Sequence, residues 1–146
     1  MRNSSILLVE DNPRDEALTL RALQKIGIAR EIIVARDGVE ALDYLFCTGK
    51  YESRDATALP HLVMLDLKLP KIDGLEVLKR LRTDERTKRL AIVIFTSSSE
   101  QEDMIKSYDL GANSYVRKPV DFEEFSEATR QLGLYWSSLN EADPRI

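Results

Sequence analysis

The segment Leu62-Val63-Met64-Leu65-Asp66 leads from four apolar residues directly into a carboxylate. A continuous apolar run of this kind is typical of a strand that is buried on both faces of a parallel sheet, because helices cover both faces. Four other short runs are also rich in Ile, Val, Leu or aromatic residues: Ile6 to Val9, Ile32 to Ala35, Ala91 to Phe95, and Ser114 to Val116. The five runs predict five parallel strands.

Helix start signals lie between these runs. Asn12 can cap a helix whose first residue is Pro13, and Gly27 can close that helix. The other helices are predicted from a short polar residue followed three positions later by an acid: Asp37 with Glu40, Asp73 with Glu76, Ser99 with Glu102, and Asp121 with Glu124. The order is strand then helix, five times. Right-handed crossovers then favour a doubly wound, flavodoxin-like α/β sheet of strand order 2-1-3-4-5.

The length of 146 residues predicts a single domain over residues 1–146, with a core from about 5 to 139 and a short polar C-terminal tail. Residues 47–60 show neither helical nor strand period, and we expect a long surface loop there. The last helix is predicted from Asp121 to Leu139, with one apolar face made of Phe122, Phe125, Leu132, Trp136 and Leu139. Its last turns would overhang the sheet, so Tyr135 and Trp136 are predicted to contact a partner or a second copy.

Composition excludes several classes of function. The net charge is −4 and the Lys and Arg residues form no basic run, so we expect no nucleic-acid partner. The longest unbroken apolar stretch, Ala91 to Phe95, is too short to cross a membrane, and the N-terminus does not resemble a secretion signal. Cys47 is the only cysteine, which rules out an internal disulfide. We therefore expect a cytoplasmic protein without a membrane partner.

Polar side chains follow the predicted strands at the points where the strands end. Glu10 and Asp11 follow the first strand and Asp66 follows the third; Thr96 follows the fourth, and Lys118 lies two residues after the fifth. These groups would converge, because the carboxyl ends of parallel strands open on one edge of the sheet. Three neighbouring carboxylates need a cation, and a hard divalent ion such as Mg²⁺ prefers oxygen ligands. The pattern predicts phosphoryl chemistry on a carboxylate.

The order and spacing of five motifs resemble the receiver domain of two-component response regulators, and the resemblance covers nearly the whole chain. The motifs are Val9-Glu10-Asp11-Asn12, Met64 to Pro70 with Asp73-Gly74, Phe95-Thr96-Ser97, Gly111 to Tyr115, and Lys118-Pro119. The long loop before the third strand and the serines at 97–99 are also similar to those of the small regulators that serve bacterial phytochrome histidine kinases.

The resemblance implies that Asp66 accepts a phosphoryl group from a phosphohistidine on a histidine kinase, and the narrower similarity suggests a kinase of the phytochrome type. His61 is the only histidine of this chain and is assigned no chemical role, so the donor would lie on another protein. Asp11 and Asp66 would bind Mg²⁺ directly, Glu10 would bind it through a water, and the backbone carbonyl of Lys68 would be a further ligand. Mn²⁺ could substitute for Mg²⁺.

The resemblance also implies how the signal leaves the site. Lys118 would pair with a phosphoryl oxygen, and the Thr96 hydroxyl would donate to the same group. Tyr115 would swing inward behind Thr96, and the signal would reach a homodimer face made by the fourth helix, the fifth strand and the fifth helix. A cis bond before Pro119 is implied as well, whereas the base rate of about 5–6% for X–Pro bonds favours trans.

The residues leave alternatives to a phosphoacceptor switch that is not an enzyme beyond its own phosphotransfer and autodephosphorylation. One is a small phosphatase with Asp66 as nucleophile, although Lys68 stands where such enzymes usually have a second Asp. Another is an intermediate phosphorelay receiver that passes the group to a phosphotransfer protein. A flavin module is disfavoured, because Glu10 and Asp11 would repel a phosphate. Ser97 and Lys68 differ from the commonest family pattern, so the lifetime of the phosphoryl group is not predicted.

Overall fold

The computed structural model describes residues 5–146, so residues 1–4 of the predicted domain lie outside the described part. Its centre is a parallel five-stranded sheet in the order β2-β1-β3-β4-β5. The strands are β1 (Ser5–Val9), β2 (Glu31–Ala35), β3 (Leu62–Leu65), β4 (Ile92–Thr96) and β5 (Ser114–Arg117). The predicted strand order is confirmed, and the predicted strand ends differ from the observed ones by at most one residue.

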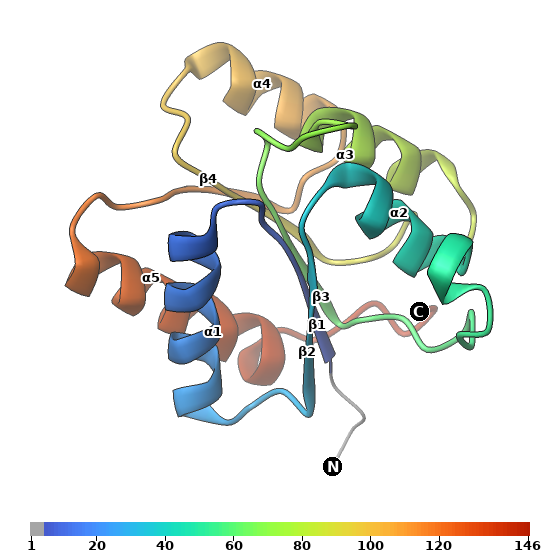
Figure 1. Cartoon of the computed structure of the whole chain (residues 1–146), viewed down its shortest axis with the longest axis horizontal. Coiled ribbons are helices and arrows are strands. Elements are labelled where there is room, and N and C mark those ends of the chain that lie inside the picture. The colour runs from blue at the N-terminus through green and yellow to red at the C-terminus, as the bar shows by residue number, and fades with distance from the viewer. Residues whose placement is uncertain (1–4) are drawn as a thin grey trace.

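Helices cover both faces of the sheet. They are α1 (Pro13–Ile26), α2 (Gly38–Phe46), α3 (Gly74–Thr83), α4 (Gln101–Asp109) and α5 (Phe122–Leu134). Figure 1 shows α1 and α5 on one face, and α2, α3 and α4 on the other. Each face has its own apolar cluster, one beneath α2 and α3 and one beneath α1 and α5. This layering leaves the carboxyl ends of the strands open between the two helical layers.

The three central strands are buried on both faces, as their continuous apolar sequences predict. Residues 6–9 and all of β3 and β4 are at most 2% exposed. The same prediction is wrong for β2 and β5, which are mostly half-buried. These are the edge strands, and each has a neighbouring strand on one side only.

Most predicted helix caps are confirmed. The side chains of Asn12, Asp37, Asp73 and Asp121 each accept a hydrogen bond from the backbone N–H three residues later. Gly27 closes α1 with a left-handed φ of 62°. The predicted cap at Ser99 is wrong, because α4 begins after Glu100 without a side-chain cap. The Ser98 hydroxyl instead donates to Asp103 in the first turn of α4, at 2.6 Å.

The segment 47–60 is more ordered than predicted. It contains a short 3₁₀ helix, η1 (Gly49–Tyr51). Arg54 lies 4.0 Å from the ring centroid of Tyr44 and donates to the Tyr44 carbonyl at 2.9 Å. A cation over an aromatic face is attracted by the ring electrons, so this contact fastens the segment to α2.

The prediction of one continuous helix from Asp121 to Leu139 is wrong at its end. α5 stops at Leu134, and a single π-helical segment, η2 (Tyr135–Leu139), follows it. The apolar face is right in its middle, where Phe125 is buried and Trp136 packs against the core. It fails at Phe122 and Leu139, which are 49% and 72% exposed. A π turn is wider than an α turn and changes the spacing of residues around the axis, so Leu139 leaves the buried face.

Among residues 5–146, no helix combines the length and the apolar character that a membrane crossing requires.

Candidate functional site

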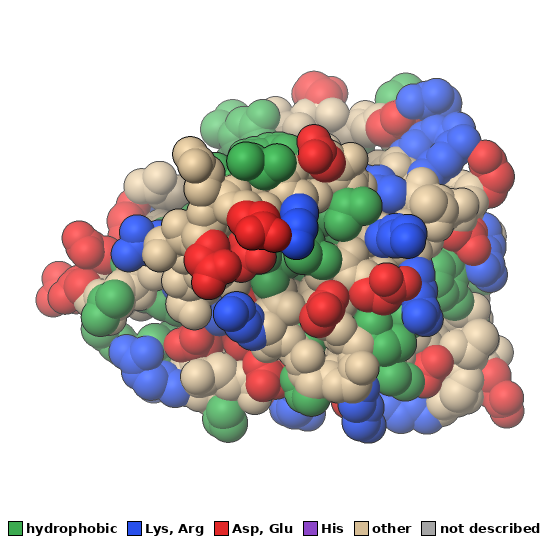
Figure 2. All heavy atoms as spheres, turned by 90° about the horizontal axis from the view of Figure 1, so that it is seen from above, with side chains coloured by type: hydrophobic (Ala, Val, Ile, Leu, Met, Phe, Trp, Pro, Cys, Tyr) green, Lys and Arg blue, Asp and Glu red, His purple; other side chains and the backbone are tan. Residues whose placement is uncertain are grey.

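The ends of four strands bring charged and hydroxyl groups to one edge of the sheet. Glu10 and Asp11 follow β1, Asp66 follows β3, Thr96 ends β4 and Lys118 follows β5. β1 lies beside β3 in register, and the Asp66 N–H donates to the carbonyl of Val9 at 3.1 Å. Figure 2 looks down on the molecule of Figure 1 and shows acidic and basic side chains side by side near the middle of this face.

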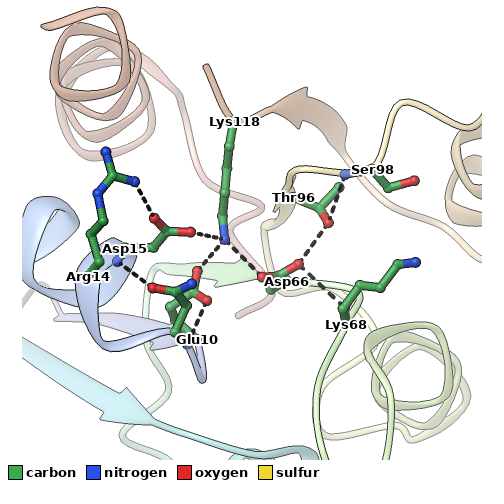
Figure 3. Close-up of polar contacts among 9 residues, drawn as sticks. Glu10, Arg14, Asp15, Asp66, Lys68, Thr96, Ser98 and Lys118 are labelled. Carbon is green, nitrogen blue, oxygen red and sulfur yellow. Dashed lines mark hydrogen bonds and ion pairs between the residues drawn. The ribbon is translucent and has the colours of Figure 1, made fainter. Parts of the chain in front are cut away.

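Lys118 is the centre of this cluster. Its Nζ lies 2.6 Å from a Glu10 oxygen, 2.8 Å from an Asp66 oxygen and 3.0 Å from an Asp15 oxygen (Figure 3). The Lys118 side chain is only 5% exposed, and those of Glu10 and Asp66 are 2% and 8% exposed. An ammonium group carries three hydrogens, so the three carboxylates use all of them.

Burial is the largest influence on the pKa values of both Glu10 and Lys118. Burial alone would lower the pKa of Lys118, but the charges and hydrogen bonds of Asp66 and Glu10 outweigh it and raise the pKa above its ordinary value. For Glu10, burial raises the pKa to about 7, although Lys118 acts in the opposite direction. Asp66 and Glu10 therefore keep Lys118 charged. Glu10 itself ionises less readily than an ordinary carboxyl group. A further cation beside Glu10 would favour the ionised carboxylate.

The backbone around Asp66 is tightly constrained. The Thr96 hydroxyl donates to Asp66 Oδ1 at 2.7 Å, and the Lys68 N–H approaches the same oxygen at 3.4 Å. A Cβ atom at Gly74 would lie 2.2 Å from the Asp66 carbonyl oxygen, so only glycine lets α3 begin this close to the strand end. The Asp66 carboxylate therefore has contacts to Thr96 at the end of β4 and to the Lys68 N–H in the loop after β3, in addition to its ion pair with Lys118.

The three acids that were predicted as metal ligands lie together. Glu10, Asp11 and Asp66 each offer one oxygen, and these oxygens all lie within 4.8 Å of one another. Glu10 and Asp66 are buried, whereas Asp11 is exposed. Carboxylate oxygens are the donors that hard divalent cations prefer, so this set fits such an ion. The side chain of Lys68 is exposed and points away from Asp66 (Figure 3).

A chain of contacts leads from Asp66 to α4. Thr96 contacts Asp66, and its hydroxyl also accepts weakly from the Ser98 N–H at 3.5 Å. The Tyr115 hydroxyl donates to the Ser98 carbonyl at 3.1 Å, and Ser98 contacts Asp103 in the first turn of α4. The predicted switch residues Thr96 and Tyr115 therefore meet at one loop, between β4 and α4.

The two residues predicted as interface contacts lie outside the acidic cluster, and their role in an interface stays a prediction. Tyr135 and Trp136 are in η2, with their rings edge to face at 5.1 Å. Tyr135 is 48% exposed, while Trp136 packs against the core beneath α1 and α5.

The cis bond implied for Lys118-Pro119 is not found, because residues 5–146 contain no cis peptide bond. The trans bond agrees with the base rate for X–Pro bonds.

Asp15 belongs to the site and was not predicted. It lies in the first turn of α1 and reaches Lys118 from there. The signal was its position three residues after the cap Asn12, because this places Asp15 in the first turn of a helix that begins at the edge where the strands end.

Comparison with known proteins agrees with this geometry. The sequence profile of the response regulator receiver domain matches residues 6–130. The response regulator Rcp1 of Synechocystis sp. (strain ATCC 27184 / PCC 6803 / Kazusa) is 36% identical over 131 residues, which cover 90% of this chain and 87% of Rcp1. The crystal structure of its Mn²⁺-bound form matches with a TM-score of 0.89 and 34% identity, over 96% of this chain and 99% of that chain.

Two further structures are similar over almost the whole chain. The phosphorylated cyanobacterial phytochrome response regulator RcpA has a TM-score of 0.90 and 34% identity, over 97% of this chain and 99% of that chain. The bacteriophytochrome response regulator AtBRR has 51% identity and a TM-score of 0.75, over 97% of this chain and all of that one (100%). The fold, the acidic cluster around Lys118 and the family match lead to one conclusion: the chain belongs to the response regulator receiver domain family.

Proposed function

We propose that this protein is a phosphoacceptor switch in which Asp66 receives a phosphoryl group from a histidine kinase in a Mg²⁺-dependent reaction. The observation that carries the proposal is the setting of Asp66. This buried carboxylate lies 2.8 Å from Lys118 and 2.7 Å from the Thr96 hydroxyl, with two more acids beside it. Intact-mass measurement after incubation with acetyl phosphate and Mg²⁺ tests it, and a gain of one phosphoryl group is expected.

Asp66, Lys118 and Thr96 each have a role in the transfer. A lone pair of an Asp66 carboxylate oxygen forms the new O–P bond while the N–P bond of the phosphohistidine breaks, and the bonding electrons stay on the departing imidazole nitrogen. Lys118 moves from the Asp66 carboxylate to a phosphoryl oxygen, and Thr96 donates its hydroxyl to another. When bound, Mg²⁺ supplies positive charge that offsets repulsion between the acids and the incoming group.

The ligand set that we propose is the one that the family resemblance implies, and the closeness of the three acids supports it. Asp11 and Asp66 would hold the ion directly, Glu10 would act through a water molecule, and the Lys68 carbonyl would complete the protein ligands. The Mn²⁺-bound form of Rcp1 supports the same class of ion, with Mn²⁺ able to replace Mg²⁺.

The output leaves through the face formed by α4, β5 and α5. Movement of Thr96 toward a phosphoryl group would pull on the Ser98 loop, to which Tyr115 and α4 are attached. On α4, Met104, Ile105 and Tyr108 are 39%, 56% and 49% exposed, which gives this helix an apolar surface. Such patches mark interaction sites.

The similarity to RcpA and AtBRR supports a kinase partner of the phytochrome type. In this proposal the chain works in the cytoplasm as one receiver domain, and the kinase supplies the phosphohistidine.

The lifetime of the phosphoryl group should depend on Ser97 and Lys68. Both are exposed and flank Asp66 and Thr96 in the sequence, where water reaches the acyl phosphate. We expect Ser97→Ala and Lys68→Ala to change the autodephosphorylation rate several-fold, and the rate of phosphorylation by a kinase less, because the kinase supplies its own geometry. Phosphorylated protein is purified and its decay is followed by intact mass. Equal changes in the two rates would contradict this prediction.

The protein should form a homodimer, because η2, which follows α5, leaves apolar surface exposed. Tyr135 and Leu139 are 48% and 72% exposed, and symmetric pairs are the commonest soluble assembly. Light scattering at micromolar concentration should give a mass above that of one chain. Tyr135→Ser with Leu139→Ser should lower it, and so should Trp136→Ala, although Trp136 also packs against the core. Val39→Ser, an exposed apolar position on α2, serves as the control. A monomer at every concentration, phosphorylated or not, would exclude the dimer.

A further inference from the structure

Asp15 is the one acid described at the site that has no role in the proposed transfer. Its carboxylate lies 3.0 Å from Lys118 Nζ, and its side chain is only 14% exposed. The Asn12 side chain accepts from the Asp15 N–H at 3.0 Å, so the start of α1 fixes its position. Figure 3 shows Lys118 reaching between Asp15 on one side and Asp66 on the other.

Lys118 cannot gain a phosphoryl partner without losing a carboxylate partner. Its three N–H bonds already reach Glu10, Asp15 and Asp66. The contact to Asp66 is replaced when that carboxylate becomes an acyl phosphate, but the contact to Asp15 remains available. Asp15 and the phosphoryl oxygens therefore draw on the same ammonium group.

A divalent cation would not relieve this competition. The oxygens of Glu10, Asp11 and Asp66 lie within 4.8 Å of one another, and Asp15 is not part of this group. Its other cationic contact is Arg14 at 3.5 Å, and that side chain is 63% exposed. Screening by water weakens an exposed pair. Lys118 is therefore the main cation for Asp15 even when the three acids hold a metal.

We propose that Asp15 is a positioning residue that acts through Lys118, and that it competes with the phosphoryl group for this lysine. The inference rests on the proposed function of Asp66. Asp15 also adds a negative charge close to a phosphoryl group that is itself negative. Both effects weaken the binding of the phosphoryl group by the site. Asp15 therefore keeps the switch reversible.

The test is the affinity for beryllofluoride, which mimics a phosphoryl group on a carboxylate, measured by calorimetry at saturating Mg²⁺. Asp15→Asn keeps the shape of the side chain and removes its charge, and it should tighten binding by about tenfold, the size expected for removing one partly screened charge. A purely structural role would weaken binding instead. Asp15→Glu restores the charge and should bind within about twofold of the unaltered protein, on the same electrostatic argument.

Glu16→Gln is the matched control. Glu16 lies in the same first turn and its side chain is 15% exposed, but its partner is Arg36 at 2.8 Å. It should leave the affinity unchanged. Asp15→Ser is a second charge-free variant in case the Asn variant does not fold.

Two failures can be told apart. If the unaltered protein binds no beryllofluoride and forms no phosphoryl adduct, the proposed function itself is wrong. If it does both, but neither charge-free Asp15 variant binds beryllofluoride more tightly than Glu16→Gln does, the competition is overturned. An equal gain for Asp15→Glu would also overturn it, because the charge would then not be the cause.

Discussion

Asp66→Asn should abolish the phosphoryl adduct that the unaltered protein forms with acetyl phosphate and Mg²⁺. The amide lacks the nucleophilic oxygen charge, and it also weakens the contact with Lys118, which lies 2.8 Å from the carboxylate. Among residues 5–146, the Thr96 hydroxyl donates to Asp66 and to no other acid of the site. Intact-mass measurement should therefore show no gain in mass for the variant.

Asp143→Asn provides the control. Asp143 is an acid near the C-terminus that lines a groove with His61 and Leu90, at the opposite edge of the sheet from Asp66. Its labelling should match that of the unaltered protein. Excess chelator should remove labelling of the unaltered protein, because the transfer requires Mg²⁺. Full labelling of Asp66→Asn, or labelling in chelator, would exclude Asp66 as the metal-dependent acceptor.

Lys118→Met should strongly destabilise the protein in the absence of divalent metal. Methionine keeps the apolar stem but removes the charge that faces Glu10, Asp15 and Asp66. Leaving buried charges without their partner costs about 3–5 kcal/mol, which corresponds to a fall of about 10 °C or more in melting temperature. Adding Mg²⁺ should recover most of this loss, because the ion supplies positive charge to the same acids.

The Mg²⁺ affinity of Lys118→Met should be equal to or tighter than that of the unaltered protein, since Lys118 is not a ligand and no longer competes for Glu10 and Asp66. Lys68→Met is the matched control, because Lys68 lies two residues after Asp66 but its side chain is exposed. It should shift neither the melting temperature nor its response to Mg²⁺ noticeably. A collapse of Mg²⁺ affinity in Lys118→Met would show that Lys118 helps to build the metal site.

The site could be predicted in outline because strand ends are readable in sequence. Glu10, Asp66 and Thr96 each stand directly at the end of an apolar run, and parallel strands end at one edge. Asp15 was missed because it is on a helix, where the sequence alone does not show which way the first turn faces. The contacts of Lys118 with three carboxylates depend on side-chain distances, which the spacing of residues in the sequence does not reveal.

The end of the C-terminal helix could also not be predicted from the sequence. Apolar spacing after Asp121 predicts a helix with one buried face, and this holds for Phe125. Whether the helix continues as α or widens to a π turn depends on how its end packs against α1 and the core, so the change at Tyr135 was not predicted. The missing cap at Ser99 is similar, because Ser98 took Asp103 as its partner instead.

The strand order, most helix starts and the edge at which the acids gather could all be predicted from the sequence. Helix starts and strands follow from periodicity and capping among residues that are close in the chain, and the strand order follows from the general preference for right-handed crossovers. Three features could not be predicted from the sequence: Asp15 faces Lys118, Tyr115 reaches the Ser98 carbonyl, and Leu139 is exposed. The reason is physical: these contacts join residues from different elements, and their distances depend on how the helices pack against the sheet.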